Sequence, residues 1–119
     1  GPFTLSFHGG THNIIHESIP VVDNVGVLVN DKFYYAGDSY AIPEGASAEW
    51  LAAPIGAPWH KNSEVMDFVM AVAPRRAFGT HDMTLSVIGR GMGRARLKWA
   101  VEQGEGEFVE LDPGDSTDL

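Results

Sequence analysis

The sequence predicts one mixed α/β domain. Short stretches rich in Val, Phe, Tyr and Trp have the character of β-strands, and two segments in the second half of the chain have helical periodicity. Strands that are followed by helices indicate a mixed α/β layer. The chain has 119 residues, 44% of them apolar, with no repeat, low-complexity tract or linker. We therefore expect a single domain over residues 1–119, with a mixed sheet that carries helices on one face.

The clearest strand pair lies on either side of Asn30-Asp31-Lys32. These turn-forming residues separate two apolar runs, so residues 25–29 and 33–36 are predicted to form a hairpin. Gly37 then allows the backbone to bend, and Asp38 emerges where the strand ends. The full set of predicted strands is 3–7, 13–15, 25–29, 33–36, 50–53, 76–79 and 107–110.

Two helices are predicted after the central strands. The first is capped by Asn62 or Ser63 and runs through residue 73, where Pro74 ends it. The second runs from about residue 84 to residue 103, and Gly104 closes it. Its start is weakened by Gly89, Gly91 and Gly93.

Charge and composition exclude several classes of function. The formal net charge of −8 argues against a nucleic-acid partner, because binding to phosphates requires clustered Lys and Arg. The one basic cluster is interpreted as the solvent-exposed face of a helix rather than an anion site, and it consists of Arg90, Arg94, Arg96 and Lys98. No apolar run of about 18 residues and no signal peptide is present, so we expect a cytoplasmic protein with no membrane partner.

Residues that can bind metal follow three of the predicted strands. They are His16, Asp38 and His81. Imidazole nitrogen and carboxylate oxygen suit zinc and similar divalent ions, and the absence of cysteine removes thiolate sites from consideration.

Three further residues are secondary candidates for the same site. His12 lies four residues before His16 and is the alternative ligand, or a residue that orients one. His60 lies in a rigid loop that could reach a pocket, although a surface position is the simpler interpretation. Asp82 is not expected to bind metal itself. It is expected to be a turn residue, or a carboxylate that supports a metal ligand without touching the metal.

From residue 11 to its end, the chain resembles the C-terminal half of a metallo-β-lactamase-fold hydrolase. The matching pieces, in order, are His16 ahead of Ile19-Pro20, Asn24-Val25-Gly26, Tyr35-Ala36-Gly37-Asp38-Ser39, Ala53-Pro54-Ile55-Gly56-Ala57-Pro58-Trp59, Val72-Ala73-Pro74-Arg75, Gly79-Thr80-His81-Asp82 and Leu111-Asp112-Pro113-Gly114. The resemblance implies half of an αβ/βα sandwich. It also implies that His16 binds one metal, that Asp38 bridges two metals, and that His81 binds the second. Zinc is the expected ion, with manganese or iron as alternatives.

The principal signature of that family, H-x-H-x-D-H, does not occur in the chain. His8 and His12 have the spacing H-x-x-x-H, and no Asp-His pair follows them. We therefore expect a fragment or half-domain of a hydrolase that acts on a small-molecule ester, lactone, amide or phosphoester. The isolated chain is expected to be inactive and to form homo-oligomers through its uncovered sheet face. The alternative is a non-catalytic half-domain or a self-associating interaction module.

Overall fold

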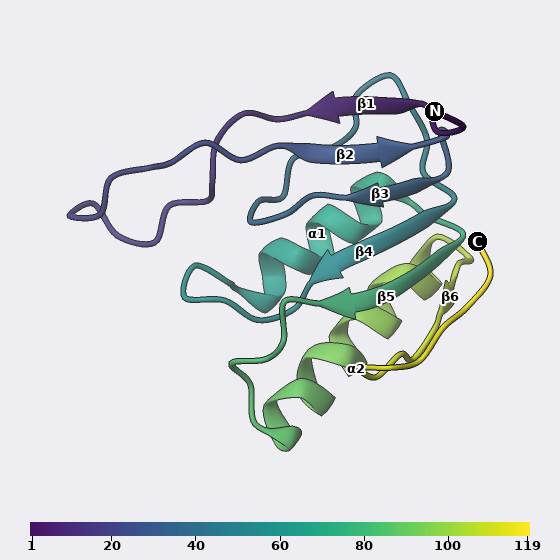
Figure 1. Ribbon diagram of the computed structural model, residues 1–119. Helices are drawn as coiled ribbons and strands as arrows, with labels where there is room; N and C mark the ends of the chain where they lie inside the picture. The colour runs from purple at the N-terminus through teal and green to yellow at the C-terminus, as the bar shows by residue number, and fades with distance from the viewer.

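The protein folds around one mixed sheet, as the sequence predicts, and this sheet has six strands instead of the seven expected. The computed structural model describes residues 1–119 (Figure 1). Along the chain the elements are β1 (Leu5–His8), β2 (Gly26–Val29), β3 (Phe33–Tyr35), β4 (Trp50–Pro54), α1 (Asn62–Val72), β5 (Arg76–Thr80), α2 (Val87–Gln103) and β6 (Glu107–Phe108). The strands lie in the sheet in the same order as in the chain. The first three pair antiparallel, and the pairs from β3 to β6 are parallel.

The hairpin between β2 and β3 has the predicted turn. Asn30 and Asp31 both have positive φ, at 52° and 53°, and the backbone N–H of Lys32 donates to the carbonyl of Val29. Two successive left-handed residues are what a type I′ turn requires, and Asn and Asp tolerate that conformation. The Asn30 side chain also accepts a hydrogen bond from the backbone of Thr4, which fixes the entry to β1.

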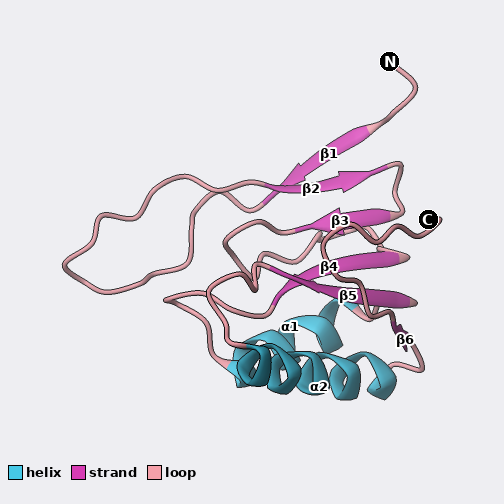
Figure 2. Cartoon of the chain, turned by 60° about the horizontal axis from the view of Figure 1, so that its bottom comes forward, coloured by secondary structure: helices cyan, strands magenta, loops and turns pink.

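Both helices pack on one face of the sheet (Figure 2). The first, α1, buries Val65, Phe68 and Val69. It ends before Pro74, as predicted, at a left-handed Ala73. The prediction that Asn62 or Ser63 caps this helix was wrong. Asn62 is its first residue, and no side chain caps it.

The second helix, α2, begins at Val87, three residues later than predicted. The side chain of Ser86 caps it by accepting from the backbone N–H of Gly89. The glycines of the first turns do not prevent helix formation. Gly93 has a packing reason, since a Cβ there would lie 3.3 Å from the carbonyl oxygen of Ile55.

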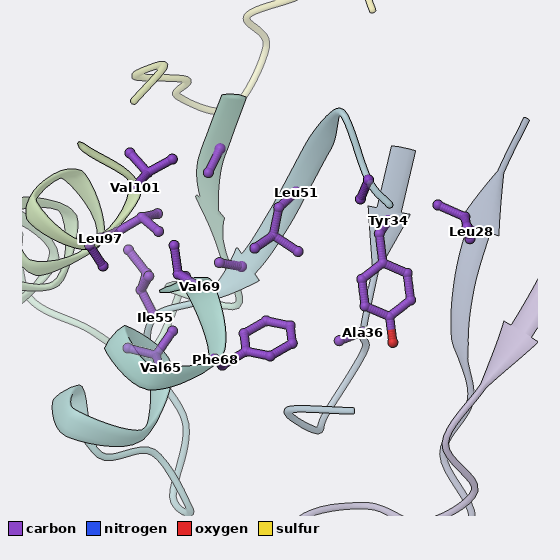
Figure 3. Close-up of a cluster of buried hydrophobic side chains, with 14 residues drawn as sticks. Leu28, Tyr34, Ala36, Leu51, Ile55, Val65, Phe68, Val69, Leu97 and Val101 are labelled. Carbon is purple, nitrogen blue, oxygen red and sulfur yellow. The ribbon is translucent and has the colours of Figure 1, made fainter. Parts of the chain in front are cut away.

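The hydrophobic core lies between the helices and the covered face of the sheet (Figure 3). Leu28, Tyr34, Leu51 and Ala77 occupy adjacent positions across β2 to β5, and all four are buried. The core also includes Ile55, Val65, Phe68, Val69, Leu97, Ala100 and Val101. Burial is therefore concentrated where helices cover the strands.

The opposite face of the sheet has no helix over it. Leu5 and Phe7 of β1 are 50% and 64% exposed, and Tyr35 of β3 is also exposed on this face. Nearer the other edge, the rings of Phe33 and Phe78 stack on each other with centroids 6.2 Å apart. We call the incompletely buried residues on this side the open sheet face, defined by Leu5, Phe7, Val27, Val29, Phe33, Tyr35 and Phe78. Trp50 and Ala52 of β4 lie on the same side by register, and both are buried.

A long excursion, residues 9–25, separates β1 from β2 and extends away from the sheet (Figure 1). The strand predicted at residues 13–15 does not form. Only an isolated bridge between Thr11 and Asp23 occurs in this region. The edge of β2 that a strand here could use is already paired with β1, and Ile14 and Ile15 are exposed. The predicted strand 107–110 is also shorter, and ends at Phe108. Neither α1 nor α2 combines the length and the apolar character that crossing a membrane requires.

Candidate metal centre

Asp38, His81 and His12 meet at the edge of the sheet where the parallel strands end. Asp38 follows β3 and His81 follows β5, so the parallel alignment of β3, β4 and β5 brings them together. The distance from His81 Nε2 to Asp38 Oδ1 is 2.6 Å, and that from His12 Nε2 to the same oxygen is 3.5 Å. A backbone hydrogen bond from Asn13 to the carbonyl of Asp38 anchors the excursion here, directly after His12.

Asn24 holds the loop that carries Asp38. Its side-chain N–H₂ donates to the carbonyl of Ala36, and its carbonyl oxygen accepts from the backbone N–H of Asp38 at 2.9 Å. Gly37 lies between these two contacts with φ of +69°, and a Cβ there would lie 2.5 Å from the Asn24 oxygen. The bend predicted at Gly37 is confirmed, and only glycine fits it.

Both imidazoles hydrogen-bond to a carbonyl through Nδ1 and face Asp38 through Nε2, but only the Nε2 of His81 hydrogen-bonds to Asp38. His81 Nδ1 hydrogen-bonds to the carbonyl of Gly56 at 2.6 Å, and His12 Nδ1 to the carbonyl of Asn13 at 2.5 Å. Because a carbonyl oxygen only accepts, the proton is on Nδ1 in each ring, and Nε2 is turned to Asp38. Histidines that bind a metal through Nε2 usually donate their other N–H in this way.

The electrostatics of His81 reflect this pairing. Burial lowers its pKa, but the hydrogen bonds to Gly56 and Asp38, together with the negative charge of Asp38, outweigh burial. The net effect raises the pKa of His81 above its usual value. Without a metal, the site therefore favours a protonated His81 that donates to the Asp38 carboxylate.

Aromatic rings form the wall behind the two imidazoles. Trp59 is only 7% exposed, and the centroid of its ring lies 5.9 Å from that of His12 and 6.0 Å from that of His81. Tyr40 packs against Trp59 and hydrogen-bonds to Nδ1 of His60. Burial, with a smaller contribution from the charge of Glu64, raises the pKa of Tyr40 well above its usual value, so the hydroxyl stays protonated. His60 thus supports the wall, and its hydrogen bonds go to Tyr40 and Asn62 rather than to Asp38.

The structure does not bring His16 to Asp38. His16 is exposed on the excursion, where its Nδ1 accepts from the backbone N–H of Ser18. Asp82 is also turned away from Asp38, and it pairs instead with Arg90 and Arg94. The assignment of metal ligands itself stays a prediction, and of the two histidines left open by the sequence, His12 is the one beside Asp38.

Sequence reasoning missed the supports of the site. Asn24 has a usable signal, because it is a polar residue directly ahead of a strand, but the sequence analysis includes it only as part of the Asn24-Val25-Gly26 match. Gly56 acts through its carbonyl, which carries no side-chain signal. Trp59 enters the sequence analysis only as the last residue of a matching piece, because a tryptophan in a loop carries no signal that links it to the histidines.

The donor chemistry suits zinc, but the arrangement of these side chains is not that of a complete site. Two imidazole nitrogens and a carboxylate are a usual donor set for zinc. Two atoms that share a tetrahedral zinc lie about 3.3 Å apart, which matches the His12 contact but not the shorter His81 contact. No group of three or more His, Asp or Glu side chains in the structure is arranged to hold a metal ion. The direct hydrogen bond between His81 and Asp38 would have to open to admit one.

A cleft of about 550 Å³ begins at His12. One wall comes from the excursion and includes Asn13 and Ile15, and the other includes Trp59 and Lys61. Of the three residues that meet at the site, only His12 lines this cleft.

Comparison with known proteins supports the fold and leaves the family open. No family model matches the chain. Protein Rv0786c of Mycobacterium tuberculosis is 39% identical over 99 residues, which is 79% of this chain and 46% of that protein. The structure of Igni18, described as a novel metallo hydrolase from the hyperthermophilic archaeon Ignicoccus hospitalis, is similar with a TM-score of 0.65 and 18% identity.

The similarity to Igni18 covers 95% of this chain and 51% of that chain. The chain thus has a fold similar to that of a metallo hydrolase. It spans about half the length of each of these two proteins.

Proposed function

We propose that the chain is the C-terminal half of a metal-dependent hydrolase of the metallo-β-lactamase-fold superfamily. The observation that carries the proposal is the convergence of two imidazoles on one carboxylate, each with its Nδ1 proton held by a carbonyl and its Nε2 turned to Asp38. The fold similarity to a metallo hydrolase supports it. In this proposal, His12 takes the role that the sequence first assigned to His16.

The remaining ligands would come from an N-terminal half with the H-x-H-x-D-H segment. Two similar proteins are about twice as long as the matched region, which supports this division. Zinc is the expected metal because the three donors here are two imidazoles and a carboxylate. The expected substrate is a small-molecule ester, lactone, amide or phosphoester.

A divalent ion bound at this site would act as a Lewis acid and would lower the pKa of a water molecule. The residues of this chain would prepare the site for that chemistry. Asn24 fixes the backbone at Asp38 by accepting from its N–H, and the carbonyl of Gly56 fixes the ring of His81. Trp59 excludes water from the rear of both imidazoles. These contacts orient the donors before any ligand arrives.

The alternative is a non-catalytic, self-associating module. The observation that favours it is the open sheet face, where Phe7 and Leu5 are at least half exposed. Exposed apolar patches on a sheet usually serve an interface. In this case the chain would form a homo-oligomer, and the Asp38 site would have no catalytic role.

Zinc binding by the isolated chain tests the hydrolase proposal. We expect weak, substoichiometric binding, because the chain supplies only three donors. The variants Asp38→Asn, His81→Ala and His12→Ala should each weaken it roughly tenfold or more. His16→Ala is the matched control, an exposed histidine of the same excursion, and should bind as the unmodified chain does. Calorimetric titration and metal analysis measure these differences.

Two results would contradict the proposal. One is tight binding of two ions by the isolated chain with no loss in Asp38→Asn. The other is robust hydrolysis of generic ester, lactone or phosphodiester substrates by the isolated chain, abolished by His81→Ala, which would mean that the chain is a complete enzyme. Restored activity when the chain is joined to an N-terminal half with H-x-H-x-D-H would support the proposal directly.

A further inference from the structure

Asp82, the residue directly after His81, belongs to an ion-pair network. Its side chain is 14% exposed and lies 3.1 Å from Arg90 Nε and 3.9 Å from Arg94 Nη2. Both arginines are on α2, one turn apart. The sequence suggested that Asp82 acts indirectly on the site, and this network is the physical route by which it could do so.

Arg94 connects Asp82 to the C-terminal segment, residues 110–112. Its guanidinium donates to Glu110 at 2.8 Å, to the carbonyl of Leu111 at 2.9 Å and to Asp112 at 2.7 Å. The Arg94 side chain is only 12% exposed. The prediction that this arginine belongs to a solvated helix face was therefore wrong, because the C-terminal segment folds back over it.

The network is sensitive to the loss of any member. Arg90 and Arg94 have the same sign of charge at a spacing of four residues, so they repel unless acidic groups separate them. Because Arg94 and Asp82 are largely removed from water, an unpaired charge at either position would be costly. Partners from two segments, Asp82 on one side and Asp112 with Glu110 on the other, balance the two arginines.

The neighbouring His81 has a conformation that requires such support. Its φ is +57°, in the left-handed region that non-glycine residues seldom adopt. Such residues persist where the surrounding structure holds them. On its C-terminal side, that support is the turn in which Leu85 N–H donates to the Asp82 carbonyl, together with the two arginines.

We infer that Arg94 is a positioning residue that ties the C-terminal segment to the turn after β5 and so keeps the His81 ring on Gly56 and Asp38. The importance of this positioning for catalysis rests on the proposed function. The coupling between Arg94 and the His81 ring can be tested on the chain without metal. Movement of the C-terminal segment is then transmitted through Arg94 and Asp82 to the metal-binding ring.

Hydrogen exchange of the His81 Nδ1 proton, measured by NMR on the metal-free chain, tests the coupling. Arg94→Gln should speed this exchange roughly tenfold or more, because it removes the charged hydrogen bonds to Glu110 and Asp112 together with the ion pair to Asp82. Arg94→Lys should recover part of the protection. Arg96→Gln is the matched control, because Arg96 is an exposed arginine of the same helix. The backbone N–H of Leu51, deep in the core, serves as an internal reference.

A second variant approaches the network from the other side. Glu110→Gln combined with Asp112→Asn removes the tail partners and leaves Arg94 in place, and it should also speed exchange at His81. This variant decides the question if Arg94→Gln does not fold. Unchanged exchange at His81, or equal acceleration at His81 and Leu51, would overturn the inference. Its failure is distinct from failure of the proposed function, which is judged by zinc binding in the Asp38 and His12 variants.

Discussion

Apolar side chains are buried in the part of the sheet that the helices cover, but many of them are exposed in the N-terminal part. In β4, β5, α1 and α2, apolar side chains such as Leu51 and Val69 are completely buried. In β1 and the excursion, residues such as Phe7 and Ile14 are more than 60% exposed. Figure 2 shows the reason, since both helices lie on one side of the sheet and toward β4 and β5.

Because of this difference, the region that supplies most of the stability is not the whole of the region that forms the site. The covered region supplies the hydrophobic burial, at roughly 25 cal/mol per Å² of apolar surface removed from water. The site is assembled at the boundary of the two regions, because Asp38 and His81 follow strands of the covered region and His12 comes from the excursion. A rigid framework thus holds two of the donors, and a more exposed segment supplies the third.

The largest expected effect is a loss of stability from a substitution in the region that the helices cover. Leu51→Ala should lower the free energy of unfolding by about 3 kcal/mol, because Leu51 is completely buried and its removal leaves a cavity. Leu5→Ala is the matched control on the open sheet face, and should change stability by less than about 0.5 kcal/mol. Urea unfolding followed by circular dichroism measures both. Equal losses for the two leucines would mean that the open sheet face is covered in solution.

The next effect concerns the bend before Asp38. Gly37→Ala should cost about 2 kcal/mol, because the new Cβ combines left-handed strain with a clash against Asn24. Gly45→Ala is the control: φ is +75° there, but no atom lies within 4 Å of the new Cβ, so only the strain, about 1 kcal/mol, remains. If Gly37→Ala costs no more than Gly45→Ala in urea unfolding, Asn24 does not hold the loop tightly.

Local signals made most of the fold predictable from sequence. The hairpin turn depends on Asn30 and Asp31 alone, and the end of α1 depends on Pro74. The strand predicted at residues 13–15 failed because strand formation needs a partner, and β1 had already taken the free edge of β2. The start of α2 moved because the hydroxyl of Ser86 was available as a cap.

The site was predictable only where strand ends define it. Asp38 and His81 each follow an apolar strand, and parallel pairing brings such positions to one edge. The choice between His12 and His16 depends on the path of the excursion. That path is set by non-local bonds, such as the one from Asn13 N–H to the Asp38 carbonyl, which no local pattern encodes.

Self-association would show whether the exposed apolar residues of the N-terminal part are covered by a second copy of the chain. If the open sheet face is an interface, the chain should form dimers or higher oligomers at micromolar concentration. Phe7→Lys should then raise the dissociation constant roughly tenfold by placing a charge on that face. Val87→Lys is the control, an 87% exposed residue at the start of α2. Light scattering that finds only monomers of the unmodified chain at these concentrations would exclude the interface.

The smallest expected effect is the pH dependence contributed by His81 at the boundary between the two regions. Its pKa is raised in the folded chain, so the stability it contributes is fully present below the unfolded value, about 6.5, and is lost as pH rises through the folded value. Asp38→Asn removes the partner charge and should flatten this decline, whereas His16→Gln should leave it unchanged. Urea unfolding of the metal-free chain between about pH 6 and pH 8 measures the slope. The same slope in the Asp38→Asn variant would mean that another group causes the decline, and that Asp38 and His81 are not coupled in solution.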